Sequence, residues 1–138
     1  MRTWFGRVRR MRVSDYATAI EVLALAIEVE IALRVMPFSR LLERLKRTSP
    51  DMTVSGDEYQ RLLRYIAVAY DVLPFRATCL RRSVVLHGLL ERRGVPSRVC
   101  FGVTKNGVAL DAHAWVECAD VTPDAAAAGY GELQAYRS

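Results

Sequence analysis

The sequence predicts an α+β protein, with helices in its N-terminal half and a small antiparallel sheet after them. Two observations support this prediction. Apolar residues recur at three-and-four spacing before Gly94, as on helices with one buried face. After Gly94 the period changes to alternation, as in strands. Helices first and strands afterwards indicate an α+β chain.

The first long helix is expected to begin at Ser14 or Asp15, either of which offers an N-cap, and to end near Val35, because Pro37 breaks the pattern. The run is apolar enough to raise the question of a membrane span. It is interrupted by four charged residues: Glu21, Glu28, Glu30 and Arg34. Each would cost roughly 2.5 to 3.5 kcal/mol inside a bilayer. We expect a helix packed against protein, and association with a membrane surface stays open.

A shorter helix is expected over about 38–46. The polar stretch 48–60, TSPDMTVSGDEYQ, is the clearest internal boundary. Ser55 and Glu58 form a capping-box pattern that predicts a helix over about 57–70. We divide the chain here into an N-terminal basic segment with helices, 1–54, and a core, 55–138, which together are expected to form one compact unit.

Thr78 can cap the next helix, which is expected from Cys79 to Arg93 and stops at Gly94. Strands are expected over 98–103 and 108–118. The Asn-Gly pair at 106 and 107 predicts a two-residue hairpin turn between them. The final fourteen residues are weakly patterned, and no element is predicted there.

The composition is that of a folded, basic domain. Hydrophobic residues make up 51% of the chain and charged residues 25%, which leaves little room for long disorder. The net charge of +5 can attract acidic peptides, acidic proteins, nucleic acid or membranes, so charge alone selects no partner. The three cysteines are widely spaced, without a CxxC pair or a secretory signal pattern, so we expect a reducing cytoplasm.

Cys79 is the candidate nucleophile because it stands at a predicted helix N-terminus, where the helix dipole stabilises a thiolate. A buried structural cysteine is the alternative. A thiol nucleophile needs a base within hydrogen-bond reach, and the chain has two histidines. His87 lies eight residues along the same helix, about 12 Å away. His113, in the run DAHAWVE, is therefore the candidate base.

The base needs an orienting partner on its other nitrogen. If Ala119 and Asp120 form a two-residue turn, Asp124 becomes a diagonal neighbour of His113, about 7 to 8 Å away along the backbone. Asp111, on the face and strand of His113, is the second choice, and Asp120 at the turn would be farther away. Ala-Asp is not a preferred turn sequence, so Asp124, Asp111 and Asp120 remain alternatives.

Other residues near the candidate site are open to two interpretations. Glu117 shares the face of His113 and is expected to be a solvated or ion-paired carboxylate, and Trp115 is expected in the core or a pocket wall. Arg81 and Arg82 either line an entrance for an anionic peptide or are solvated helix residues.

Cys100 and Cys118 are expected to be structural. A zinc site formed by them with Cys79 and His113 is the alternative, but the spacing has no recognisable zinc pattern. We expect neither a metal nor a cofactor.

Two stretches carry a family resemblance. Residues 79–103, CLRRSVVLHGLLERRGVPSRVCFGV, are followed by AHAWVE at 112–117, and an upstream segment reads LRVMPFSRLLERL at 33–45. These features resemble the transglutaminase-like cysteine peptidases of lasso-peptide biosynthesis, specifically the short, split type of leader peptidase. That family shows a Cys-Leu-x-x-Ser helix start, a Leu-Leu-x-x-x-Gly helix end, a strand ending in Gly-Val, and His-Ala-Trp-x-Glu.

The resemblance implies a transglutaminase- or papain-like core, with the catalytic cysteine at a helix N-terminus packed on a small antiparallel sheet. Cys79 would be the nucleophile and His113 the base. The third member follows the histidine by roughly a dozen residues in such proteins, which agrees with Asp124. The implied activity is removal of the leader from a lasso-peptide precursor, which frees the core peptide for macrolactam formation by a separate ATP-dependent cyclase.

The resemblance also implies partners. The split type lacks its own leader-binding domain, and a separately encoded RiPP recognition element binds the leader; the cyclase is a further candidate partner, and no nucleic acid is expected. The apolar segment 16–38 becomes a candidate interface. The competing functions are an acyl transferase or amidase on the same scaffold, and a non-catalytic basic binding module.

Overall fold

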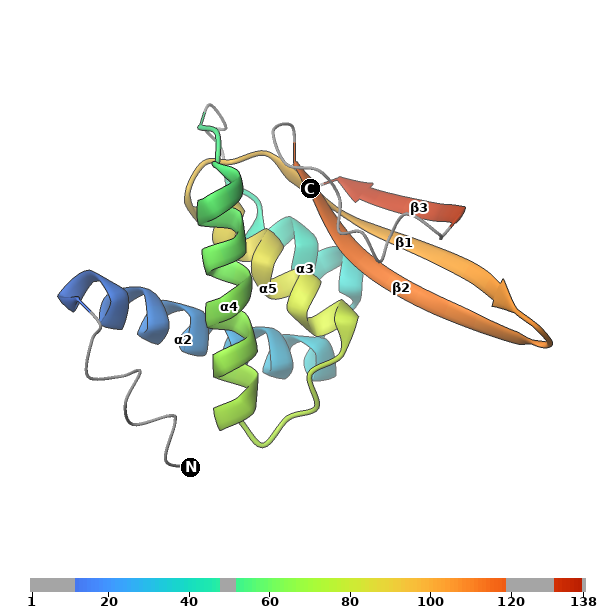
Figure 1. Ribbon diagram of the computed structural model, residues 1–138, viewed down its shortest axis with the longest axis horizontal. Coiled ribbons are helices and arrows are strands. Elements are labelled where there is room, and N and C mark those ends of the chain that lie inside the picture. The colour runs from blue at the N-terminus through green and yellow to red at the C-terminus, as the bar shows by residue number, and fades with distance from the viewer. Residues whose placement is uncertain (1–11, 48–51, 119–130, 138) are drawn as a thin grey trace.

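The computed structural model describes residues 12–47, 52–118 and 131–137, and it confirms the α+β architecture (Figure 1). The elements in these ranges are α2 (Val13–Val35), α3 (Phe38–Leu45), α4 (Gly56–Val72), α5 (Cys79–Arg92), β1 (Ser97–Asn106), β2 (Ala109–Cys118) and β3 (Gly131–Arg137). The strands form an antiparallel sheet in the order β2-β1-β3. The helices gather near one end of the sheet, and the tip of the β1–β2 hairpin projects away from them.

The start of α2 differs from the prediction. The helix begins at Val13, before both predicted caps, and its N-cap is Arg12. The backbone N–H of Arg12 donates to Asp15 Oδ2 at 2.8 Å. Asp15 therefore acts from inside the first turn, where a carboxylate satisfies an amide and favours the positive end of the helix dipole.

The caps predicted for α4 and α5 are confirmed. Ser55 Oγ accepts from the N–H of Glu58 at 3.2 Å, and Thr78 Oγ1 accepts from the N–H of Arg81 at 3.3 Å. Gly94, just after α5, has φ of +70°, a conformation that glycine adopts without strain.

The hairpin turn lies one residue later than predicted. Asn106 pairs with Ala109, so the two-residue loop consists of Gly107 and Val108. Gly107 has φ of +67°, and among the described residues a positive φ occurs at glycines alone. A glycine at the first loop position is typical of a type II′ turn, which matches the twist of the strands.

The strand β3 is not predicted by the sequence. It lies in the weakly patterned tail and pairs with β1, with a register shift between Phe101 and Gly102. The turn predicted at Ala119 and Asp120, and the strand predicted after it, lie outside the described residues.

Helix α5 is the centre of the core. It is buried from Ser83 to Glu91 and packs against α2, α3, α4, β1 and β2. Gly88 permits the close approach, because a Cβ at this position would lie 3.0 Å from Leu25 Cδ2 and 3.3 Å from Leu45 Cδ2.

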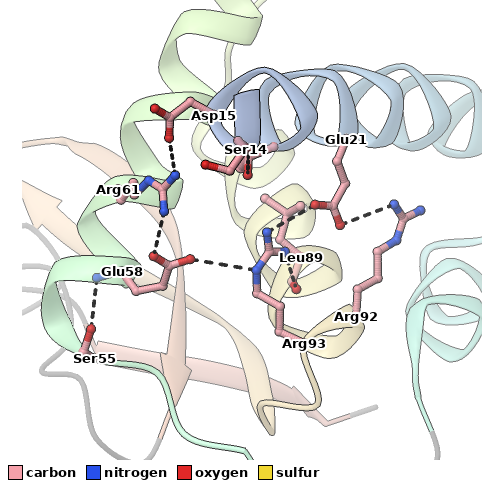
Figure 2. Close-up of polar contacts among 10 residues, drawn as sticks. Ser14, Asp15, Glu21, Ser55, Glu58, Arg61, Leu89, Arg92 and Arg93 are labelled. Atoms are coloured by element: carbon pink, nitrogen blue, oxygen red, sulfur yellow. Dashed lines mark hydrogen bonds and ion pairs between the residues drawn. The ribbon is translucent and has the colours of Figure 1, made fainter. Parts of the chain in front are cut away.

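Ion pairs join the C-terminal end of α5 to α2 and α4 (Figure 2). Arg93 lies 3.2 Å from Glu21 of α2 and 4.0 Å from Glu58 of α4. Arg61 of α4 pairs with both Glu58 and Asp15. All of these side chains are partly exposed, so the pairs align the three helices more than they stabilise them.

Helix α2 packs against protein along one side, as expected. Its residues Val22, Leu25 and Val29 are fully buried in the core. Within the described ranges, neither α2 nor another helix combines the length and apolar character needed to cross a membrane.

Candidate active site

Cys79 is the first residue of α5 and carries a free, partly buried thiol. Thr78 satisfies two amides of the first turn, because its side chain accepts from Arg81 N–H and its carbonyl from Arg82 N–H. The N–H groups of Cys79 and Leu80 have no acceptor within the helix, by the geometry of a first turn. Such amides stabilise a thiolate, or an oxyanion that forms beside it.

A buried carboxylate on α2 holds the chain segment that precedes Cys79. Glu30 is 1% exposed, and its Oε1 lies 2.8 Å from Arg34 and its Oε2 2.9 Å from Arg81 Nε. Arg81 also donates from Nη1 to the carbonyl of Arg76 at 2.6 Å, in the segment that leads to Cys79. Glu30 therefore joins α2, through Arg81, to the backbone just before the nucleophile.

Two aromatic residues complete this cluster. The guanidinium of Arg34 lies 5.3 Å from the ring centroid of Phe75, in the same approach segment. Tyr70 is buried, and desolvation together with the charge of Glu30 raises the pKa of its hydroxyl to about 12. Its hydroxyl therefore stays protonated beside the carboxylate at any physiological pH.

The sequence analysis missed the role of Glu30, which it treated as an interruption of an apolar run. The available signal was its spacing from Arg34, four residues later, which is an ion-pair spacing on a helix. The two arginines of α5 also separate in role: Arg81 is engaged inside the protein, whereas Arg82 is exposed.

His113 belongs to a row of alternate residues on β2. Its imidazole stacks on the indole of Trp115, with ring centroids 6.1 Å apart and planes 18° from parallel. Trp115 Nε1 donates to Glu117 Oε1 at 3.1 Å. Arg98, opposite Glu117 on β1, donates from Nε to Glu117 Oε2 at 2.9 Å. The row thus supports the imidazole through a chain of fixed side chains.

The ion-paired role expected for Glu117 is confirmed. The hydrogen bond from Trp115 is the largest influence on this carboxyl, and with the hydrogen bond and charge of Arg98 it outweighs desolvation and lowers the pKa of Glu117. Glu117 is therefore ionised at neutral pH and occupied by structural partners. Trp115 is buried, as expected of a core or wall residue.

The position across from His113 is a glycine. Gly102 pairs with His113 in the β1–β2 ladder, so β1 places no side chain directly beside the imidazole. The register shift between β1 and β3 occurs at Phe101 and Gly102, and it brings Glu132 opposite Gly102. Such irregularities often occur next to active sites, where they change the direction of a side chain.

The two faces of the hairpin have different surroundings. Val99 and Val116 belong to the core shared with the helices, and the carbonyl of Val116 accepts from the Tyr59 hydroxyl at 3.1 Å. Because side chains alternate along a strand, His113 lies on the opposite face from Val116. Helix α5 packs on β2, but the core that it shares with the hairpin lies on the face of Val116, so this packing does not by itself bring His113 to Cys79. A hydrogen bond between the two side chains stays a prediction.

The third member of the site also stays a prediction. Asp111 is exposed on β2, two residues before His113 on the same face. Asp124 and Asp120 lie outside the described residues. Glu132 occupies the register position opposite Gly102, and the sequence analysis did not consider it because β3 was not predicted.

His87 has a structural environment. It is fully buried in α5, with Nδ1 at 2.7 Å from Ser97 Oγ. Burial lowers the pKa of its imidazole to about 4, so the ring is neutral at physiological pH. Over the described part of the chain, no three His, Cys, Asp or Glu residues form a group that could hold a metal ion.

Comparison with known proteins identifies one family. The model of the transglutaminase-like superfamily matches residues 23–137, which include Cys79 and His113. No curated protein and no solved structure matches the chain.

Proposed function

The chain belongs to the transglutaminase-like superfamily, whose members are generally cysteine-dependent enzymes, and on this premise we propose that it is a cysteine peptidase that removes the leader from a lasso-peptide precursor. The observation that carries the proposal is the location of Cys79 at the first residue of α5, where helix amides and the dipole favour a thiolate. The leader-peptidase assignment rests in addition on the resemblance of residues 79–103 and 112–117 to that family.

The first half of the proposed reaction forms a thioester. His113 accepts the thiol proton of Cys79, and the sulfur attacks the carbonyl carbon of the last leader residue. Amides at the start of α5, those of Cys79 and Leu80, are the candidate donors to the resulting oxyanion. The C–N bond then breaks, and His113 returns the proton to the amine of the first core residue.

The second half restores the enzyme. His113 takes a proton from water, and the hydroxide attacks the thioester carbonyl. The C–S bond breaks, the leader leaves with a new carboxylate, and the proton returns to Cys79. The freed core amine is the nucleophile that a separate cyclase needs for macrolactam formation.

The proposal includes a partner that presents the leader. A separately encoded RiPP recognition element would bind the leader and deliver its end to Cys79, and the cyclase would take over the product. The basic excess of the chain would favour an acidic partner or peptide.

The test is cleavage of a precursor peptide followed by mass spectrometry, with and without the leader-binding partner. We expect two fragments whose summed mass exceeds the precursor by one water, and a faster reaction with the partner present. Cys79→Ala and His113→Ala should abolish cleavage with folding intact. Cys118→Ala is the matched control, because Cys118 is also a partly buried cysteine that forms no disulfide, and it should remain active.

Other products would identify the competing functions. Joining of the leader to an added amine indicates an acyl transferase, and conversion of a side-chain amide to an acid indicates an amidase. Cleavage that persists in Cys79→Ala or His113→Ala would refute the proposed mechanism. No reaction, together with nucleic-acid affinity that falls steeply with salt, would indicate a basic binding module.

The same assay can identify the carboxylate that orients His113. Four neutral variants are compared: Asp124→Asn, Asp111→Asn, Asp120→Asn and Glu132→Gln. Substitution of the orienting residue should lower kcat by orders of magnitude, because the imidazole loses its correct tautomer and direction. The other three variants should stay within a few-fold of the parent.

A further inference from the structure

Helix α2 is apolar on two sides. One side packs in the core, and the other carries exposed apolar residues along its whole length. We call this second side the outer face of α2; its residues are Val13, Tyr16, Ala17, Ile20, Ala24, Ile27, Ile31 and Val35.

The outer face is large for the surface of a monomer. Val13 is 87% exposed, Ile20 67% and Ile31 55%. From Val13 to Val35 the face extends about 33 Å along the helix. Contiguous apolar patches on monomers rarely exceed roughly 300 to 600 Å², and larger ones mark interaction sites. A surface of this extent is therefore expected to be covered by a partner.

The arrangement of residues is nearly symmetric about Ala24. Val13 and Val35 lie eleven residues to either side of it. Nearer the centre, Ala17 and Ile31 lie seven residues away, and Ile20 and Ile27 lie four and three residues away. An antiparallel copy of the helix would thus place valine near valine at both ends and alanine next to alanine at the centre. Such self-complementarity is what a two-fold interface requires.

We propose that the outer face of α2 pairs with the outer face of a second copy of this chain, antiparallel and centred on Ala24. The small side chain of Ala24 lets the two helices approach closely where they cross. Pairing would remove both outer faces from solvent. The total area buried would approach the lower end of the range for stable interfaces, about 1,200 Å².

The charges that border the outer face favour this partner. Glu21 is paired within its own chain to Arg92 and Arg93, and Glu28 is paired to Arg92 and Arg44. The carboxylates of this border are therefore already paired, and on the other border Arg34, which is 58% exposed, is paired to Glu30 of its own chain. A basic partner would find no uncompensated carboxylate along this edge.

The first test is sedimentation of the full chain over a range of concentrations. We expect a dimer with a dissociation constant in the micromolar range. Ile20→Lys should weaken the dimer by about tenfold or more, because it places a charge in the apolar interface. The matched control is Val108→Lys, a fully exposed apolar position at the hairpin tip, far from α2, which should leave the dimer unchanged (Figure 1).

The second test locates the two-fold axis. Ala24→Cys should form a disulfide-linked dimer on mild oxidation, because the two residues meet at the centre of the pairing. Ser14 is exposed on the same helix but lies outside the outer face. Ser14→Cys should therefore form no more disulfide-linked dimer than the parent chain. A parent chain that stays monomeric would overturn the proposal, even if its outer face bound another protein or lipid vesicles. A dimer unaffected by Ile20→Lys would overturn it as well.

Discussion

At the scale of single residues, Glu117 holds Trp115 and Arg98 at once, and the ring of Trp115 supports the imidazole of His113. Glu117 does not react in the proposed mechanism. Its contribution is orientation, which is the usual role of a carboxylate behind a functional imidazole.

Glu117→Ala should therefore lower kcat for leader cleavage by about ten- to a hundredfold with little change in KM, because the imidazole loses its support while substrate binding remains. Glu117→Gln should be less damaging, since its amide oxygen can still accept from Trp115. Steady-state kinetics would measure both variants, with the exposed Asp57→Asn as control. Unchanged kcat in a folded Glu117→Ala protein would contradict the orienting role.

The other histidine makes stability depend on pH. Because burial lowers the pKa of His87 to about 4, from 6.5 in the unfolded chain, the unfolded chain binds a proton first as the pH falls. The free energy of unfolding should therefore decrease between pH 6.5 and pH 4, by on the order of 3 kcal/mol in total from this group. Urea denaturation at several pH values would measure the decrease.

Two variants isolate the contribution of His87. His87→Asn can keep a hydrogen bond to Ser97 but has no imidazole to protonate, so its stability should depend less on pH over this range. His113→Ala should keep the dependence of the parent chain. If His87→Asn followed the parent curve, another group would be responsible.

At the scale of secondary-structure elements, the contact between α5 and its neighbours depends on Gly88. Gly88→Ala gains about 1 kcal/mol in helix propensity, but its methyl group would press on Leu25 and Leu45. Overpacking costs about 1 to 3 kcal/mol, so we expect a net loss of about 1 kcal/mol in chemical denaturation. Gly56→Ala is the matched control, because a Cβ there has nothing within 4 Å, and it should be neutral or slightly stabilising. Equal stability of both variants would exclude the tight contact.

The same scale explains why Glu30 matters, since it links α2 to the segment before Cys79. Glu30→Gln leaves Arg81 and Arg34 without their charged partner and should destabilise the fold by about 1 to 3 kcal/mol, less than a fully buried pair because both arginines reach solvent. It should also lower kcat below that of the parent when both are fully folded. Denaturation and kinetics would be measured together, with the exposed Glu43→Gln as control. Full activity in the folded variant would show that Glu30 is structural alone.

At the scale of the whole molecule, the sequence predicted what depends on local chemistry. The Ser55 and Thr78 caps, the break at Pro37 and the end of α5 at Gly94 each follow from a few neighbouring residues, and all are confirmed. The strand β3 was missed because its tail has little alternation of its own, and its pairing with β1 is a contact distant in sequence. The turn was placed one residue early because Asn-Gly is also a strong turn sequence.

In the candidate site, too, the features set by local sequence could be predicted and those set by distant contacts could not. The placement of Cys79 at a helix start and of His113, Trp115 and Glu117 on one face of a strand could be predicted, since helix caps and alternation determine them. The Glu30–Arg81 pair could not, because its residues are 51 positions apart and meet only when α2 packs on α5.

The enclosure of α5 has a consequence for how the molecule opens. Amides at the centre of a helix that packs against α2, α3, α4, β1 and β2 can exchange hydrogen with solvent only when the whole structure unfolds. Cys79 lies just before the buried stretch of this helix, which begins at Ser83, so the element that positions the nucleophile is expected to be lost only with the whole fold. Loss of activity on heating should then coincide with global unfolding, and the slowest-exchanging amides should report the full free energy of unfolding.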